Sequence, residues 1–187
     1  MRDFVVSADR FVRNGEPIRI FSGSLHYTRV PRAYWRDRLL RLRALGLNTV
    51  CTYIPWALHQ PAFDVPPSFE GELDVAYFVR EAQSCGLMVL LRLGPYIDAE
   101  YDLGALPGWL LGPRAGIKQL RTNDTNYLRY VQRWYSALLP PLKSLLWQAG
   151  GPVVMVQIEN EYGAFVEAGG TSRTGAYTYK RALHSQV

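Results

Sequence analysis

Cysteine and histidine are scarce in this chain of 187 residues, which contains two cysteines and three histidines. Cys51 lies in an apolar, strand-like stretch and Cys85 directly precedes Gly86, so we expect both to be buried free thiols. Two such residues form no disulfide framework, and the chain has no CxxC pair. The histidines are scattered along the sequence: His26, His59 and His184. The sequence therefore predicts neither a metal site nor a cofactor.

Long hydrophobic runs are also missing. The first 21 residues lack the apolar core of a signal peptide and lead directly into strand-like sequence. We therefore expect no secretory signal, no transmembrane segment and no membrane partner, and the location of the protein stays open. No Gly-x-Gly-x-x-Gly follows the first strand-like stretch, which disfavours a dinucleotide-binding fold.

Positive charge is in moderate excess, with a formal net charge of +5. Six arginines fall between residues 29 and 43, where leucines interleave with them at helical spacing. This pattern is typical of the solvated face of an amphipathic helix. Since no phosphate-binding loop, zinc-finger spacing or RNA-binding signature accompanies the arginines, we expect no nucleic-acid partner.

Aromatic residues, in contrast, are abundant. Five tryptophans and twelve tyrosines contribute to an aromatic content of 13%, within a hydrophobic content of 48%. Such a chain is long and apolar enough to fold as a globular domain with a real core. The aromatic excess fits a sugar-binding cleft, and it fits an ordinary aromatic core equally well.

Strand-like and helix-like stretches alternate along the chain, and Asn14-Gly15 predicts a hairpin turn. The expected strands span residues 4–7, 10–13, 18–22, 48–53, 87–92 and 153–158. The expected helices span 31–45, 73–85, 123–146 (interrupted or ended near Pro140-Pro141) and 174–184, with loops at 54–72 and after the strand 87–92. This order predicts an α/β fold with a parallel sheet, right-handed crossovers and long loops after the strands, as in a TIM-type (β/α) barrel.

The stretch VVMVQIENEYG, residues 153–163, is the most informative segment. An apolar run typical of a buried parallel strand ends in Glu159, Asn160 and Glu161. A carboxylate beside an amide and an aromatic ring at the carboxyl end of a barrel strand suits acid catalysis on a sugar. The alternative is that both glutamates begin a solvated connection between the strand and the next helix.

Three segments carry a family resemblance in the same order: SGSLHYTRVPRAYWRDRLLRLRALGLNTVCTYIPWALHQP, LRLGPYIDAEYDLGALPGWLL and VVMVQIENEYG. The chain resembles the family 35 glycoside hydrolases, the β-galactosidases of animals, plants and microbes. The resemblance implies a (β/α)8 barrel followed by β-rich domains, and hydrolysis of terminal non-reducing β-D-galactose with retention of configuration. It implies that residues 1–187 are the N-terminal half of that catalytic domain, truncated to about the first four βα units, with a divergent end at 166–187.

The resemblance also assigns roles to five residues. Glu161 matches the general acid/base, and Asn160 matches the amide that binds the sugar's 2-hydroxyl. Tyr53 matches a tyrosine that contacts galactose, while Ala99 and Glu100 match positions that contact its hydroxyls. Without the family, Tyr53 reads as a core aromatic at a strand end and Glu100 as half of a surface salt bridge.

Two acidic residues near these positions have no assigned role. If the strand continues past residue 158, Glu159 and Glu161 face the same way, and their repulsion would raise the pKa of one of them. Asp98 stands where many relatives have cysteine. It adds a charge beside the expected sugar pocket, so the sugar and aglycone preference stays open.

A retaining glycosidase needs a second carboxylate about 5 Å from the first, to attack the anomeric carbon. The resemblance implies that this nucleophile comes from a strand beyond residue 187. Two functions therefore remain: a β-galactosidase that acts on β-galactoside carbohydrate, or a catalytically inactive truncated isoform or fragment with at most sugar- or protein-binding activity. An unrelated barrel enzyme with a single carboxylate base is a third.

Half a barrel leaves sheet edges unpaired, and residues 153–158 form an apolar edge strand. Such an edge is a template for pairing with another chain. We therefore expect low stability of the chain alone, or self-association through the open edges.

Overall fold

The computed structural model describes residues 2–187, and Met1 lies outside the described part. The chain forms two compact units, each made of separate stretches of sequence. The first unit contains the chain up to Tyr53, Phe69–Arg92 and Pro141–Gln157. The second unit contains Ile54–Ser68, Leu93–Pro140 and Ile158–Val187.

The first unit begins with a small antiparallel sheet of β1 (Phe4–Ser7), β2 (Arg10–Arg13) and β3 (Glu16–Ile18). Between β2 and β3, Asn14 and Gly15 both have positive φ, 51° and 85°, as a tight two-residue hairpin turn requires. The predicted hairpin turn is thus confirmed.

The predicted single strand at residues 18–22 is wrong, because β3 ends at Ile18 and β4 (Ser22–Ser24) begins a different sheet. The Asn48 side chain explains the break. Its Nδ2 donates to the Arg19 carbonyl at 2.7 Å, and its Oδ1 accepts from the Phe21 amide at 2.9 Å. These backbone groups are therefore satisfied by a side chain instead of a neighbouring strand.

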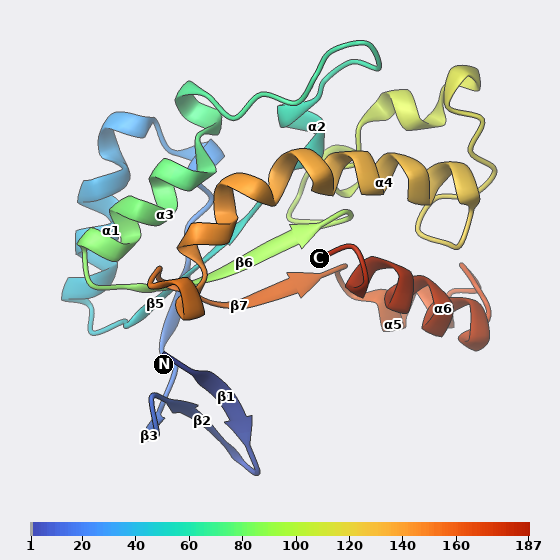
Figure 1. Cartoon of the computed structure of the whole chain (residues 1–187). Helices are drawn as coiled ribbons and strands as arrows, with labels where there is room; N and C mark the ends of the chain where they lie inside the picture. The colour runs from blue at the N-terminus through green and yellow to red at the C-terminus, as the bar shows by residue number, and fades with distance from the viewer. Residues whose placement is uncertain (1) are drawn as a thin grey trace. The chain divides into compact units, whose positions relative to one another are not determined.

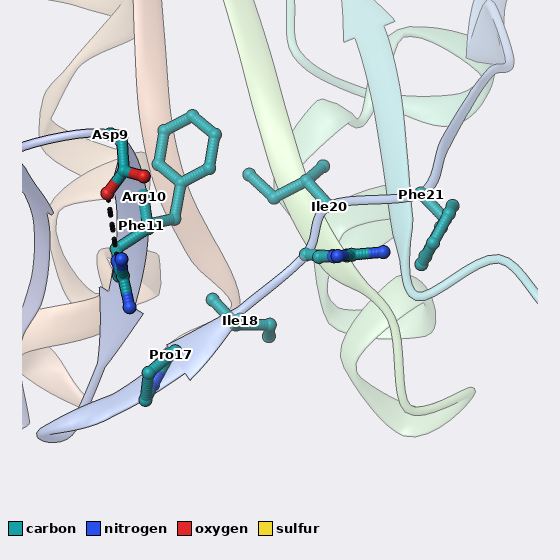
Figure 2. A pocket seen from close by; sticks show the side chains of 8 residues that line it. Asp9, Arg10, Phe11, Pro17, Ile18, Ile20 and Phe21 are labelled. Atoms are coloured by element: carbon teal, nitrogen blue, oxygen red, sulfur yellow. Dashed lines mark hydrogen bonds and ion pairs between the residues drawn. The ribbon is translucent and has the colours of Figure 1, made fainter.

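A shallow hollow lies beside this small sheet and is lined by residues 9–11 and 17–21 (Figure 2). Figure 2 shows the Asp9–Arg10 ion pair at its rim, and the rest of the labelled lining is apolar. None of the five residues predicted to bind or act on sugar lines this hollow.

The second sheet of the first unit has the order β4–β5–β6–β7, with β5 at Thr49–Tyr53, β6 at Met88–Gly94 and β7 at Val153–Ile158 (Figure 1). β4 pairs in parallel with β5, and β5 with β6. The arrows of β6 and β7 also run in the same direction in Figure 1. The predicted parallel sheet is confirmed, and β7 has the predicted bounds. Val156 in β7 is 42% exposed, but self-association through this strand stays a prediction.

Two helices of the first unit, α1 (Trp35–Ala44) and α3 (Val75–Ser84), pack on each other through apolar faces. The Trp35 ring meets the Phe78 ring edge-on at 5.5 Å between centroids, and both side chains are fully buried. The arginines of α1 lie on its exposed face, as their helical spacing predicts, and Arg41 pairs with Asp37 one turn earlier.

The second unit contains α2 (Trp56–His59), α4 (Thr125–Leu138), α5 (Tyr162–Glu167) and α6 (Arg173–His184). The predicted loop at 54–72 contains α2, and α5 was not predicted. The predicted helix at 123–146 ends at Leu138, and a 3-10 segment follows at Pro140–Leu145, since proline cannot continue the helical hydrogen bonding. Asp124 caps α4 by accepting from the Asn126 and Tyr127 amides.

The two cysteines differ in burial. Cys85 is buried as expected, whereas Cys51 is only half-buried, and both thiols are free. Over residues 2–187, no helix has both the length and the apolar character needed to cross a lipid bilayer.

Candidate active site

Tyr53 is the predicted site residue that belongs to the first unit, where it ends β5. Its ring stacks on His26 with 4.5 Å between centroids and 16° between planes. Arg92 donates to the Tyr53 hydroxyl and lies 4.3 Å from the centre of the ring. Tyr53 is half-buried, so its position is not that of a simple core aromatic. Its ring and hydroxyl are both oriented by polar neighbours.

The other four predicted residues lie in the second unit, and two of them directly follow β7. Glu159 and Glu161 adopt left-handed backbone conformations, with φ of 61° and 46°. The idea that the strand continues through both glutamates is therefore wrong. Since the chain turns on either side of Asn160, the alternation of a strand no longer applies. Glu159 is 3% exposed, whereas Glu161 is exposed.

The buried Glu159 carboxylate is held by several donors. The Arg121 Nη2 donates to Glu159 Oε2 at 2.7 Å, and Arg121 Nε donates to the same oxygen at 3.2 Å. The Asn160 amide donates to Oε2 at 3.1 Å, and the Tyr179 hydroxyl donates to Oε1 at 2.8 Å. Burial raises the pKa of Glu159, and the Arg121 guanidinium, the Asn160 amide and the Tyr179 hydroxyl oppose that rise. The Glu159 carboxylate is therefore hydrogen-bonded by groups of the protein itself.

The tyrosines around Glu159 keep their protons. Burial raises the pKa of Tyr179 well above its usual value, and the Glu159 charge adds to this effect. Burial also raises the pKa of Tyr162 to about 12. The Tyr127 hydroxyl lies 3.4 Å from the Tyr179 hydroxyl. Protonated phenols are donors at neutral pH, so Tyr179 can serve Glu159 as described.

Ala99 and Glu100 lie on the segment after β6, beside Asp98. All three have positive φ, between 51° and 57°. Ala99 is half-buried, while Asp98 and Glu100 are exposed. The Tyr96 hydroxyl donates to Asp98 Oδ1 at 3.1 Å, so a neighbouring phenol orients this exposed carboxylate.

Gly104 makes room for the Tyr96 ring. A Cβ at Gly104 would stand 2.0 Å from a Tyr96 ring atom, and its φ of 60° is unfavourable for other residues. The Ile97 amide donates to the Gly104 carbonyl at 2.9 Å, which closes the segment into a compact loop. Ala99 and Glu100 lie within this loop.

Arg121 links the loop after β6 to the segment after β7, within the second unit. The Arg121 guanidinium lies 3.7 Å from the centre of the Tyr96 ring, and its Nη2 also donates to the Asn160 carbonyl at 2.6 Å. The Glu159 amide donates to the Gly94 carbonyl at 2.7 Å. The structure thus brings Ala99, Glu100, Asn160 and Glu161 onto two connected segments.

Sequence reasoning missed Arg121, Tyr96 and Tyr179. A carboxylate directly after an apolar strand, as at Glu159, indicates that a cation or several donors must be near. The partner of Glu159 is 38 residues away, and the chain offers 21 lysines and arginines. The sequence therefore indicates that Glu159 needs a partner, but it does not identify that partner.

Two solved structures share the fold of this chain at low sequence identity. A GH5_18 protein from Streptomyces cattleya, in complex with GlcNAc, has a TM-score of 0.66 at 15% identity, covering 89% of this chain and 41% of that one. The exo-β-1,4-mannosidase Op5Man5 from Opitutaceae bacterium strain TAV5 has a TM-score of 0.68 at 13% identity, covering 91% and 29%. At such identities the similarity concerns the fold alone: a partial TIM-type (β/α) barrel, as the sequence predicts.

Curated relatives are much closer in sequence. The chain is 50% identical over 159 residues to human β-galactosidase and 48% identical over 164 residues to β-galactosidase 8 of Oryza sativa subsp. japonica. These alignments cover 85% and 88% of this chain but 23% and 24% of the relatives, so the chain spans about a quarter of their length. The family model of the glycosyl hydrolases family 35 matches residues 10–187. The chain belongs to family 35 of the glycosyl hydrolases.

Proposed function

We propose that this chain supplies the acid/base part of a β-galactosidase active site, with Glu161 as the general acid/base. The proposal is supported by the family and by relatives that carry the name β-galactosidase. One observation carries the assignment to Glu161. Of the two carboxylates after β7, Glu159 is buried and neutralised by Arg121, whereas Glu161 is exposed and can meet a ligand.

The proposed substrate is a carbohydrate with a terminal β-galactose. Asn160 binds its 2-hydroxyl, and Tyr53, Ala99 and Glu100 contact its other hydroxyls. In the retaining reaction Glu161 first protonates the departing glycosidic oxygen and later removes a proton from the water that releases galactose. A second carboxylate, about 5 Å away, attacks the anomeric carbon. The family resemblance attributes this nucleophile to a strand outside residues 1–187.

A chimera tests the proposal. The 159-residue segment that aligns with human β-galactosidase replaces its counterpart in that protein. We expect the chimera to hydrolyse an aryl β-galactoside and Glu161→Gln to lower kcat by about 10²–10⁴-fold, the usual contribution of a general acid/base. The matched control is Glu70→Gln, which alters an exposed glutamate in the first unit and should leave kcat unchanged. A folded chimera in which both variants behave alike would contradict the proposal.

The second candidate is a catalytically inactive isoform or fragment that at most binds sugar or another protein. The chain spans about a quarter of the relatives' length, so the activity of residues 1–187 by themselves needs a test of its own. The purified 187-residue chain separates the candidates. Hydrolysis of an aryl β-galactoside that Glu161→Gln abolishes would show independent catalysis, and absence of turnover with retained galactose binding would support the second candidate for the isolated chain.

A further inference from the structure

Arg121 makes two kinds of contact at once, one to a carboxylate and one to a backbone carbonyl. Its guanidinium donates to the Glu159 carboxylate and also to the Asn160 carbonyl, the latter at 2.6 Å. That carbonyl belongs to the peptide bond that joins Asn160 to Glu161. One planar fork therefore fixes both the residue before the sugar-binding amide and the peptide that leads to the proposed acid.

The backbone at this point needs such support. Glu159 and Glu161 both have positive φ, a conformation that is unfavourable for residues with a Cβ. Residues in this conformation persist where their surroundings over-determine them, and they cluster at functional sites. Three hydrogen bonds provide this support here. The Glu159 N–H donates to the Gly94 carbonyl, and the Asn160 N–H donates to the Glu159 carboxylate. Arg121 donates to the Asn160 carbonyl.

Arg121 is itself held on several sides. Its side chain is 12% exposed and lies against three rings, at 3.7 Å from the centre of Tyr96, 4.7 Å from Phe165 and 5.5 Å from Tyr162. The Tyr162 hydroxyl donates to the Arg121 carbonyl at 2.6 Å. Tyr162 directly follows Glu161, so Arg121 contacts the residues on both sides of the proposed acid.

We propose that Arg121 and Glu159 form a positioning pair that sets the backbone orientation of Asn160 and Glu161 for the sugar. Neither residue touches substrate in this proposal. Glu159 is an internal anchor, and Arg121 transmits its position to the Asn160–Glu161 peptide. The proposal rests on the proposed function for its purpose, but the local geometry that it predicts can be measured without catalysis.

The experiment uses the 187-residue chain and three variants: Arg121→Lys, the double variant Arg121→Gln with Glu159→Gln, and Arg114→Gln. Lysine keeps the charge but not the fork, so it cannot hold both oxygens in one plane. The double glutamine variant removes both charges together and so leaves no buried charge unpaired. Arg114→Gln is the matched control, because Arg114 forms a two-bond pair with Asp64 at an exposed position of the same unit.

Amide hydrogen exchange and galactose titration are followed by NMR. In the folded Arg121→Lys and double variants, we expect exchange of the Asn160 amide to accelerate at least tenfold, with shifts of the Asn160 and Glu161 signals. Amides of β5 and β6 should be unaffected, which a general loss of stability would not allow. The Kd for D-galactose should rise at least tenfold. Arg114→Gln should leave all these values unchanged.

Two results would overturn the positioning role: exchange at Asn160 that stays as slow as in the parent chain in the folded double variant, or acceleration shared equally by β5 and β6. If the parent chain does not bind galactose while Asn160 exchange still depends on Arg121, the positioning pair stands. In that case the sugar-binding part of the proposed function fails for the isolated chain.

Discussion

Two ion pairs in the second unit have the same chemistry but opposite surroundings. Arg114 meets Asp64 through two hydrogen bonds of 2.8 and 2.9 Å, with side chains 64% and 70% exposed. Arg121 meets Glu159 at 2.7 Å, with side chains 12% and 2% exposed. The first pair is screened by water, whereas the second stands among rings and protonated phenols.

The two pairs have similar bond lengths but should contribute differently to the stability of the fold. An exposed pair loses side-chain entropy and gains little, since each charge is well solvated without the other. A buried pair is hard to form but very costly to break, because removing one partner leaves a buried charge alone. Arg121 also donates to the Asn160 backbone carbonyl, whereas the two Arg114 bonds described above both go to the Asp64 carboxylate. The buried pair therefore also holds the backbone that follows β7.

The largest expected effect comes from breaking the buried pair alone. Arg121→Gln should lower the free energy of unfolding by about 3–5 kcal/mol, because Glu159 stays buried without its main counter-charge. Urea denaturation measures this value. Arg114→Gln, measured alongside, should leave the denaturation midpoint unchanged. Equal effects of the two variants would abolish the distinction between the pairs.

His59 offers a second comparison, between a buried charge that is paired and a buried base that is kept neutral. Burial lowers the pKa of His59 from 6.5 to about 4, while its Nδ1 donates to the Ser68 carbonyl at 2.6 Å. Between these values the unfolded chain binds more protons than the folded chain, so stability should rise with pH from about 4 to 6.5.

The shift corresponds to about 3 kcal/mol of stability that is present above pH 6.5 and lost as the pH falls toward 4. Urea denaturation across this pH range, compared between the parent chain and His59→Asn, isolates the contribution, since an asparagine amide can still donate to Ser68. A pH dependence that is identical in the two proteins would show that folding does not lower the pKa of His59.

A smaller effect is expected from Tyr179→Phe, which removes a single donor to Glu159. Arg121 and the Asn160 amide remain, so the cost should be about 1.5 kcal/mol, at the low end of the range for one hydrogen bond to a charged group. Tyr177→Phe, at a residue that is 60% exposed, is the control and should be neutral in thermal unfolding. A neutral Tyr179→Phe would mean that Glu159 does not depend on this phenol.

The smallest effect belongs to the exposed pair. Asp64→Asn should leave the midpoint of thermal unfolding unchanged at both low and high salt, since solvent already screens this carboxylate. A clear loss of stability at low salt would show that exposure is a poor guide to the strength of these pairs.

The sequence predicted the parallel sheet and the bounds of β7 because apolar runs of strand length leave few alternatives. It misjudged the residues after β7 because positive φ at Glu159 and Glu161 follows from tertiary contacts with Arg121 and Gly94, which local propensity does not encode. Asn48 is a similar case, since its side chain binds the Arg19 carbonyl, directly after β3, from 29 residues away. The family resemblance named Asn160 and Glu161 but not the residues that hold them.

The most direct test of the central claim varies the leaving group in the chimera with human β-galactosidase. If Glu161 protonates the departing oxygen, Glu161→Gln should slow the glycosylation step most for methyl β-galactoside, whose leaving group is a strong base. It should slow that step least for 2,4-dinitrophenyl β-galactoside, whose leaving group departs without a proton. A graded loss, read from kcat/KM, supports the account. An equal loss for both substrates would contradict it.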